Sequence, residues 1–196
     1  VLVDVSRSVL EAVDRSFLLA VLGELNRQCR SLRVFFFDTD VRDVTDAVES
    51  PAGVGSALDA AEAEWGGGTR IGHSLATIRR EFPHAIYRST RTLVVSDGLE
   101  VGEIETLERE MARLSCRSTG VLWLNPLAAS SAYEPTCRGM AASLPYVDGL
   151  FAFSHADDLD EIARQLHQQG FGGAIGYQYD HRRRSGDRDA AAGGTN

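Results

Sequence analysis

Apolar, strand-like runs alternate with helical segments along most of this chain, and the alternation limits the folds that it can adopt. The apolar runs cover residues 1–3, 33–37, 91–96, 119–124 and 150–153, and helical periodicity covers 9–30, 58–65, 71–82, 103–116, 135–144 and 156–168. Strands that are apolar at almost every position are typical of parallel sheets with both faces buried. The pattern therefore predicts an α/β fold, with a doubly wound, mainly parallel sheet flanked by helices on both faces.

One segment departs from this alternation directly after the second strand. Residues 41–45 alternate between apolar and polar side chains, as an edge strand does. Only a short polar turn over 38–40 separates them from the apolar run at 33–37, which favours a hairpin. We therefore expect one antiparallel edge strand beside the parallel ones.

The length of 196 residues fits one domain with a substantial core. We expect this domain to cover residues 1–169, and residues 170–196 to form a flexible tail because they carry too few large apolar side chains to build a core. The chain opens inside its first predicted strand and does not begin with Met. We therefore expect a fragment in which the N-terminal strand is truncated.

The composition argues against several classes of function. A net charge of −8 disfavours a nucleic-acid binder that works by neutralising phosphates. The chain contains no lysine, which excludes both a Schiff-base lysine and the lysine of a P-loop ATPase. No apolar run is long enough to span a membrane, and no secretory signal is visible. The three cysteines, Cys29, Cys116 and Cys137, form no C-x-x-C pair, so we expect free thiols and a cytoplasmic location.

Polar side chains follow the predicted strands where a ligand site of such a fold is expected. The first strand ends in a D-x-S-x-S motif made of Asp4, Ser6 and Ser8, a glycine-rich loop carries Thr69, and Asp97 ends a later strand. In doubly wound sheets, ligands bind beyond the carboxyl ends of the strands, where the strand order reverses. If the strands before Asp4 and Asp97 are neighbours, both carboxylates converge there. These hard oxygens predict a site for Mg²⁺, with Mn²⁺ or Ca²⁺ as alternatives.

The ligand count of this site suggests what it does. Two carboxylates and three neutral hydroxyls do not saturate six-coordinate Mg²⁺, which normally keeps some of its waters. The bound metal would therefore stay electrophilic, and a Glu or Asp of another protein could replace a water. We expect a site that binds acidic partners, not an enzyme.

Other interpretations of the same residues remain open at this point. Alone, the D-x-S-x-S motif is more typical of a helix N-cap, and Thr69 and the Ser96-Asp97-Gly98 segment are typical of turns. A metal-dependent hydrolase or phosphotransferase would use the same cation, but no G-x-S-x-G motif is present, and His73 and His84 have no evident orienting partner. A third possibility is a structural module with a vestigial site.

The set of Asp4, Ser6, Ser8, Thr69 and Asp97 resembles the metal-ion-dependent adhesion site of von Willebrand factor A domains. The resemblance covers about residues 1–168 and implies the doubly wound fold described above. It also implies that these five residues ligate the metal.

Several stretches are similar to a narrower bacterial group, the CoxE-like proteins. They are residues 34–39 (VFFFDT), 65–72 (WGGGTRIG), 95–98 (VSDG), 123–126 (WLNP), 133–135 (YEP), 139–140 (GM) and 144–148 (LPYVD). The commonest form of the group has Gly and Met where this chain has Arg7 and Val9. This difference concerns the affinity for the metal more than the existence of the site.

The resemblance to CoxE-like proteins implies an accessory role. These proteins are encoded beside MoxR-type AAA+ ATPases and are associated with the maturation of metalloenzymes, including carbon monoxide dehydrogenase. By this resemblance the chain would bridge a MoxR-type ATPase and a client metalloenzyme, such as a molybdenum hydroxylase. It would use Mg²⁺ to bind an acidic side chain of its partner.

Overall fold

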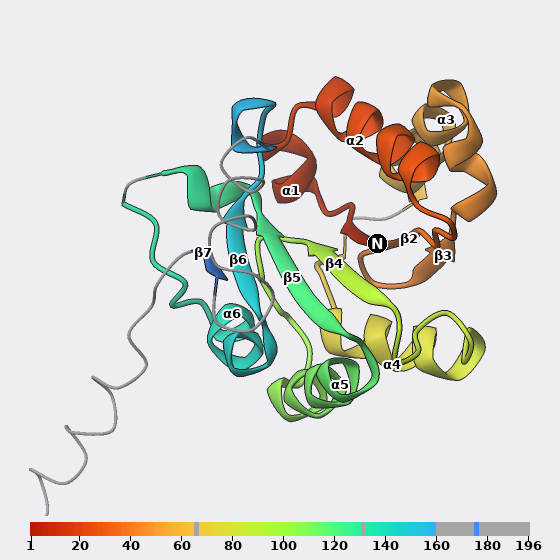
Figure 1. Cartoon of the computed structure of the whole chain (residues 1–196). Helices are drawn as coiled ribbons and strands as arrows, with labels where there is room; N and C mark the ends of the chain where they lie inside the picture. The colour runs from red at the N-terminus through yellow and green to blue at the C-terminus, as the bar shows by residue number, and fades with distance from the viewer. Residues whose placement is uncertain (65–66, 131, 160–174, 177–196) are drawn as a thin grey trace, which may run out of the picture.

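The computed structural model describes residues 1–64, 67–130, 132–159 and 175–176, and Figure 1 shows the arrangement of its elements. Within these residues, strands form one sheet in the order β3-β2-β1-β4-β5-β6-β7. The strands are β1 (Leu2–Asp4), β2 (Phe35–Phe37), β3 (Val41–Asp43), β4 (Arg91–Val95), β5 (Gly120–Asn125), β6 (Gly149–Ala152) and β7 (Ile175–Gly176). Neighbouring strands pair in parallel except β2 and β3, which are antiparallel. The predicted fold class and the antiparallel edge strand are both confirmed.

Helices cover both faces of the sheet. They are α1 (Arg7–Ala12), α2 (Arg15–Gln28), α3 (Pro51–Glu64), α4 (Ile71–Glu81), α5 (Ile104–Arg117) and α6 (Arg138–Ser143), with 3₁₀ turns η1 (Thr45–Glu49), η2 (Pro126–Ala129) and η3 (Leu144–Tyr146). Helices α1, α2 and α3 lie on one face, and α4, α5 and α6 lie on the other (Figure 1). The sheet is therefore the middle layer of three.

The core is divided by the sheet into two apolar clusters. Successive residues of a strand point to opposite faces, so Val3 packs with α1 and α2 while its neighbour Leu2 packs with α4 and α5. Phe35 and Phe37 join the second cluster, and Phe36 joins the first. The near-continuous apolar character of these strands follows from this burial on both sides.

The first helical segment is broken, contrary to expectation. The periodicity over 9–30 predicts one helix, but the structure has α1 and α2 separated at Val13 and Asp14. The Asp14 carboxylate accepts a hydrogen bond from the backbone N–H of Phe17 at 2.7 Å, which makes it the N-cap of α2. The backbone N–H of Asp14 donates to the carbonyl of Ser154 at 3.1 Å. The apolar stripe continues across the break, which is why periodicity alone does not reveal it.

Two further expectations differ from the structure or lie outside it. Helix α3 begins at Pro51, seven residues before the predicted start at Leu58, because its first turns consist mostly of small residues and glycine and so show no apolar stripe. The predicted helix over 156–168 is outside the described residues from 160 onward, and so are most of the predicted tail and the domain boundary at 169. Within the described part of the chain, no helix has the length and apolar character needed to cross a membrane.

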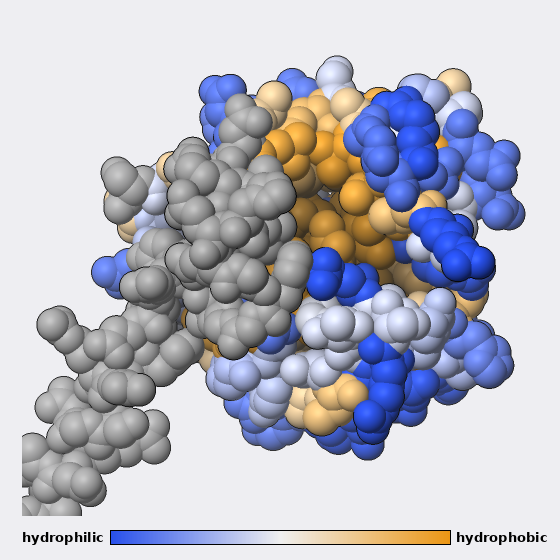
Figure 2. All heavy atoms as spheres, in the orientation of Figure 1, coloured by the Kyte–Doolittle hydropathy of each residue, from blue (hydrophilic) through white to orange (hydrophobic). Residues whose placement is uncertain are grey.

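The two ends of the central strands differ in character. At the amino ends of β1, β2 and β4 lies a hollow of about 750 Å³ whose lining includes Val1, Leu25, Leu32, Phe82 and Leu93. Figure 2 shows apolar side chains gathered in the middle of this face, beside the N-terminus marked in Figure 1. At the carboxyl ends, by contrast, the strands end in buried aspartates and serines.

The position of β1 decides where those polar residues meet. It lies between β2 and β4, and pairs in parallel with both of them. The sheet is extended from β1 in opposite directions, which makes its carboxyl end the point where the strand order reverses. Asp4, which ends β1, is therefore next to the segment that follows β4.

The N-cap at Asp14 gives a first prediction. Replacing Asp14 by Ala removes the acceptor for the first turn of α2, and we expect the free energy of unfolding to fall by about 1 kcal/mol. Urea denaturation followed by circular dichroism measures the change. Asp14→Asn, which keeps an acceptor oxygen, is the control and should retain most of the stability. An unchanged midpoint for Asp14→Ala would contradict the assignment of this cap.

Candidate metal centre

The carboxylate of Asp4 is the hub of a buried polar cluster. Its Oδ1 accepts hydrogen bonds from the backbone N–H of Ser6 at 2.9 Å and from the Thr69 hydroxyl at 3.3 Å. Its Oδ2 accepts one from the Ser96 hydroxyl at 2.6 Å. Asp4 has no exposed surface. Three segments that are far apart in the sequence thus meet at one side chain.

The second half of the cluster is built around Asp97. The Ser8 hydroxyl donates to Asp97 Oδ2 at 2.6 Å, and the hydroxyl oxygens of Ser8 and Ser6 lie 3.3 Å apart. Ser6 is joined to Asp4 through its backbone, as described above. The structure therefore brings all five residues singled out in the sequence, including Thr69, into one hydrogen-bonded group at the carboxyl ends of β1 and β4.

The geometry of α1 bears on the helix-cap interpretation. Ser6 occupies the N-cap position in an extended conformation, but its side chain makes no capping hydrogen bond. Instead the Ser6 hydroxyl faces that of Ser8, which in turn donates to Asp97. The backbone of the motif thus starts the helix, while its side-chain oxygens remain directed at the cluster.

Burial and charge leave Asp4 electrostatically unsatisfied. The pKa of Asp4 is raised from its ordinary value of 3.8 to about 7, chiefly by burial and in smaller part by the negative charge of Asp97. The hydrogen bonds from Ser96 and Ser6 act in the opposite direction and are outweighed. Two carboxylates that repel each other in a buried place form an arrangement that a cation would stabilise.

The two loops that carry Thr69 and Asp97 are fastened together. The backbone N–H of Val101 donates to the Thr69 carbonyl at 3.0 Å. The buried carboxylate of Glu100 accepts from the N–H of Gly72, at the start of α4, at 2.9 Å. Gly98 has φ +80°, a conformation that glycine adopts readily and other residues do not. The two loops therefore form one unit, and a shift of either loop would move both Thr69 and Asp97.

A second layer of side chains holds the backbone beneath Asp97. The indole N–H of Trp123 donates to the Ser96 carbonyl at 2.8 Å. The amide Nδ2 of Asn125 donates to the Asp97 carbonyl at 3.1 Å and to the Tyr133 hydroxyl at 2.8 Å. Both Trp123 and Asn125 are completely buried. The WLNP segment and the YEP segment thus meet underneath the candidate metal loop.

Helix α6 closes the same loop from its other side. The Sγ of Cys137 lies 3.4 Å from the carbonyl oxygen of Gly98. A Cβ added to Gly139 would lie 2.2 Å from that same oxygen, so only glycine allows the helix to come this close. The GM pair at 139–140 is therefore a packing requirement of the loop.

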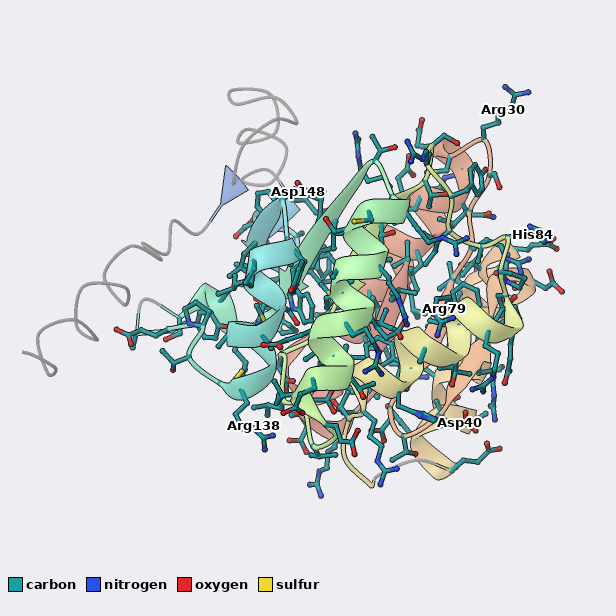
Figure 3. All side chains as sticks on the ribbon, turned by 90° about the horizontal axis from the view of Figure 1, so that it is seen from below. Arg30, Asp40, Arg79, His84, Arg138 and Asp148 are labelled. Carbon is teal, nitrogen blue, oxygen red and sulfur yellow. The ribbon has the colours of Figure 1, made fainter. Side chains whose placement is uncertain are left out.

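Two residues of the candidate site, Ser96 and Glu100, are not evident in the sequence, and Arg7 lies outside the cluster. Ser96, which we interpret from sequence as part of a turn, donates the shortest hydrogen bond to Asp4, and Glu100 carries no sequence signal at all. Figure 3 shows Arg138 and Asp40 at the lower edge of the molecule and His84 at its right-hand side, and His84 lines the hollow at the amino ends of the strands. Arg7 is exposed and pairs with Glu11 at 2.7 Å, so its charge is compensated outside the cluster.

The donor atoms fit a hard divalent cation. They are carboxylate and hydroxyl oxygens, which Mg²⁺, Mn²⁺ and Ca²⁺ prefer. Among the described residues, no group of three or more His, Cys, Asp and Glu side chains is close enough to hold a metal. A thiolate or imidazole zinc site is thus absent from that part of the chain, and any cation here would depend on Ser and Thr hydroxyls.

A family model matches most of the chain. The model described as "VWA domain containing CoxE-like protein" covers residues 1–159, a range that includes every residue of the cluster. None of the curated proteins compared with the chain matches it.

Solved structures with the same fold support this match. A von Willebrand factor type A protein from Catenulispora acidiphila has a TM-score of 0.57 at 16% identity, over 87% of this chain and 42% of that one. BatB from Bacteroides thetaiotaomicron has a TM-score of 0.52 at 16% identity, over 84% and 93%. Proximal thread matrix protein 1 from the mussel byssus has a TM-score of 0.53 at 14% identity, over 84% and 44%. At these identities the likeness concerns the fold alone.

The raised pKa of Asp4 predicts how metal binding varies with pH. In the metal-free protein, the stability that this carboxyl contributes is complete below its unfolded pKa of 3.8 and is lost as the pH rises through about 7. Because binding a cation requires the ionised form, we expect Mg²⁺ to bind about tenfold more weakly at pH 6 than at pH 8. Thermal melts over a Mg²⁺ titration at both pH values measure the difference. Asp4→Asn should show no such dependence, and an equal response of the wild type at both values would refute this prediction.

The second layer predicts the effect of changing Asn125. Asn125→Asp keeps the shape but removes both donated hydrogen bonds and places a carboxylate against the Asp97 carbonyl. We expect the free energy of unfolding to fall by about 1–3 kcal/mol. Tyr133→Phe removes only one of these bonds and should cost clearly less. Urea denaturation of the two variants decides, and equal losses would contradict the role given to the Asp97 carbonyl.

Proposed function

The chain belongs to the family of CoxE-like proteins that contain a von Willebrand factor A domain, and on that premise we propose that it is a non-catalytic, metal-dependent module that binds other proteins. One observation carries the proposal. Asp4, Ser6, Ser8, Thr69 and Asp97 form a single hydrogen-bonded cluster at the point where the strand order reverses. This is where doubly wound sheets bind their ligands.

The proposed role of these residues is to hold Mg²⁺ with an incomplete shell. The hydroxyls of Ser6, Ser8 and Thr69 are neutral, so only the carboxylates of Asp4 and Asp97 offset the charge of the ion. A cation held in this way still attracts anionic oxygen. A Glu or Asp of a partner would replace one of the metal's waters. Mn²⁺ or Ca²⁺ could take the place of Mg²⁺, because the donor atoms are the same.

We propose further that the partners are a cytoplasmic MoxR-type AAA+ ATPase and a client metalloenzyme, such as a carbon monoxide dehydrogenase-like molybdenum hydroxylase. The support is the resemblance of the WLNP, YEP and GM segments to CoxE-like proteins. In this chain those segments brace the loop of Asp97. The protein would then act as an adaptor that presents the client to the ATPase.

No specific observation favours the hydrolase alternative. In the described part of the chain, the only histidine hydrogen-bonded to a serine hydroxyl is His155, with Ser154, away from the cluster. His84 lines the hollow at the amino ends of the strands and lies at the right-hand side of Figure 3. Neither His155 nor His84 is therefore a candidate general base for a metal-bound water at the cluster.

The experiment measures how much of a MoxR-type ATPase, taken from the genes beside the one for this chain, is recovered on the immobilised protein. The recovery is compared in millimolar Mg²⁺ and in EDTA. We expect recovery to fall by about tenfold or more in EDTA and in the double variant Asp4→Ala with Ser6→Ala. Glu11→Ala, an exposed change one helical turn away, is the matched control and should bind as the wild type does.

Two outcomes would refute the proposal. Equal recovery with and without Mg²⁺ would eliminate the metal bridge. Turnover of generic phosphoesters or esters that is lost in Asp97→Asn would show an enzyme in place of an adaptor. A thermal melt that Mg²⁺ does not shift would favour a vestigial site, since a ligand bound only by the folded state must raise its stability.

A further inference from the structure

Two large apolar side chains are exposed directly beside the candidate metal centre. Leu99 is 45% exposed and Val101 is 58% exposed, and both lie on the loop that follows Asp97. Among the described residues few large apolar side chains are this exposed, and Tyr87, at 53%, lines the hollow at the amino ends of the strands. Exposed apolar side chains that adjoin a ligand site commonly mark a binding surface.

The loop cannot turn these side chains into the core. Its backbone is held by Glu100, which bonds to Gly72, and by the hydrogen bond from Val101 to Thr69. The side chain of Val101 lies over Gly68, where an added Cβ would be 3.2 Å from its Cγ1. The exposure of Leu99 and Val101 is thus built into the loop that positions Asp97.

Two arginines lie on segments that pack against the two ends of the loop carrying Leu99 and Val101. Arg70 passes beside Gly102, with its Cγ 3.9 Å from where a Cβ of that glycine would be. Arg138 begins α6, and the next residue, Gly139, packs on Gly98. Both arginines are exposed, and neither forms an ion pair with any residue that the structure describes. We call Arg70, Leu99, Val101 and Arg138 the rim patch.

The positive charge of the rim patch contrasts with the net negative charge of the chain. The chain has a net charge of −8, and many of its other arginines are paired, as Arg79 and Arg113 are with the buried Glu110. Two guanidiniums that form no ion pair with a described residue attract acidic segments to this edge, where Figure 3 places Arg138. Exposed ion pairs add little affinity by themselves, but they orient a ligand and accelerate its association.

We propose that the rim patch selects a partner segment in which the metal-bound carboxylate is flanked by apolar side chains and then by further carboxylates. The inference rests on the proposed function and names the class of segment that the site takes. The central Glu or Asp completes the metal shell. Its apolar neighbours cover Leu99 and Val101, and the outer carboxylates meet Arg70 and Arg138. The apolar contacts supply affinity, because they remove exposed hydrocarbon from water.

The test uses short blocked peptides with a fluorescent label, followed by anisotropy in Mg²⁺ and in EDTA. The first peptide has a central Glu between two Leu residues, with Asp at both ends. The second has Ser in place of Leu, and the third has Gln in place of Glu. We expect the Leu peptide to bind at least about tenfold more tightly than the Ser peptide in Mg²⁺, and the Gln peptide to lose binding.

Variants of the rim patch locate the effect. Leu99→Ser with Val101→Ser should remove the preference for Leu over Ser while leaving the Mg²⁺ dependence. The double variant Arg70→Gln with Arg138→Gln should lower the affinity for the Leu peptide and reduce the salt dependence of its binding. The matched controls are two exposed positions, Tyr87→Ser at the hollow at the amino ends of the strands and Arg30→Gln at the edge opposite Arg138 in Figure 3, and both should bind as the wild type does. Thermal melts confirm that the four variants fold.

The outcomes separate this inference from the function on which it rests. Equal, Mg²⁺-dependent binding of the Leu and Ser peptides would overturn the inference and leave the metal bridge intact. Binding of the Leu peptide that neither EDTA nor the Gln substitution weakens would overturn both. Failure of all three peptides to bind at millimolar concentration would overturn the inference as well.

Discussion

The buried carboxylate of Asp4 is the constraint around which this edge of the molecule is organised. It ends the strand between β2 and β4, and it accepts hydrogen bonds from Ser6, Thr69 and Ser96. A buried charge is costly unless it is paired or well hydrogen-bonded. The three segments must therefore stay close around it, and none of them can move alone. The fold thus places a partly compensated carboxylate among the hydroxyl oxygens of the cluster.

Residues of the WLNP and GM segments lie beneath this cluster, one layer further from the solvent. Trp123 and Asn125 bond to the carbonyls of Ser96 and Asp97, and Gly139 lets α6 approach the next carbonyl. These contacts are made to the backbone, so they fix the path of the loop whatever side chains it carries. The oxygen cluster and the WLNP segment therefore have different roles. The segment holds the backbone of the loop, and the loop carries Asp97, a candidate metal ligand.

The sequence predicts the layers, the antiparallel edge strand and the five residues of the cluster, because these depend on local patterns. Strand alternation and a D-x-S-x-S motif can be recognised within a few residues, and the topology of doubly wound sheets then brings their ends together. What depends on distant partners is missed. Asp14 breaks the first helix with its own side chain and a bond to Ser154, and Glu100 matters only because Gly72 lies beside it. The oxygens of the cluster suit several hard divalent cations equally.

The shared loop has a thermodynamic consequence for the proposed module. Asp97, Leu99 and Val101 belong to one short segment, and hydrogen bonds through Glu100 and Val101 join it to the loop of Thr69. A cation or a partner protein that orders this segment therefore favours the loop geometry that the other one needs. By linkage, a cation that strengthens partner binding must itself be held more tightly in the complex. Metal and partner would then act as mutual effectors, although neither α4 nor α6 has to move, because the coupling needs only the loop between them.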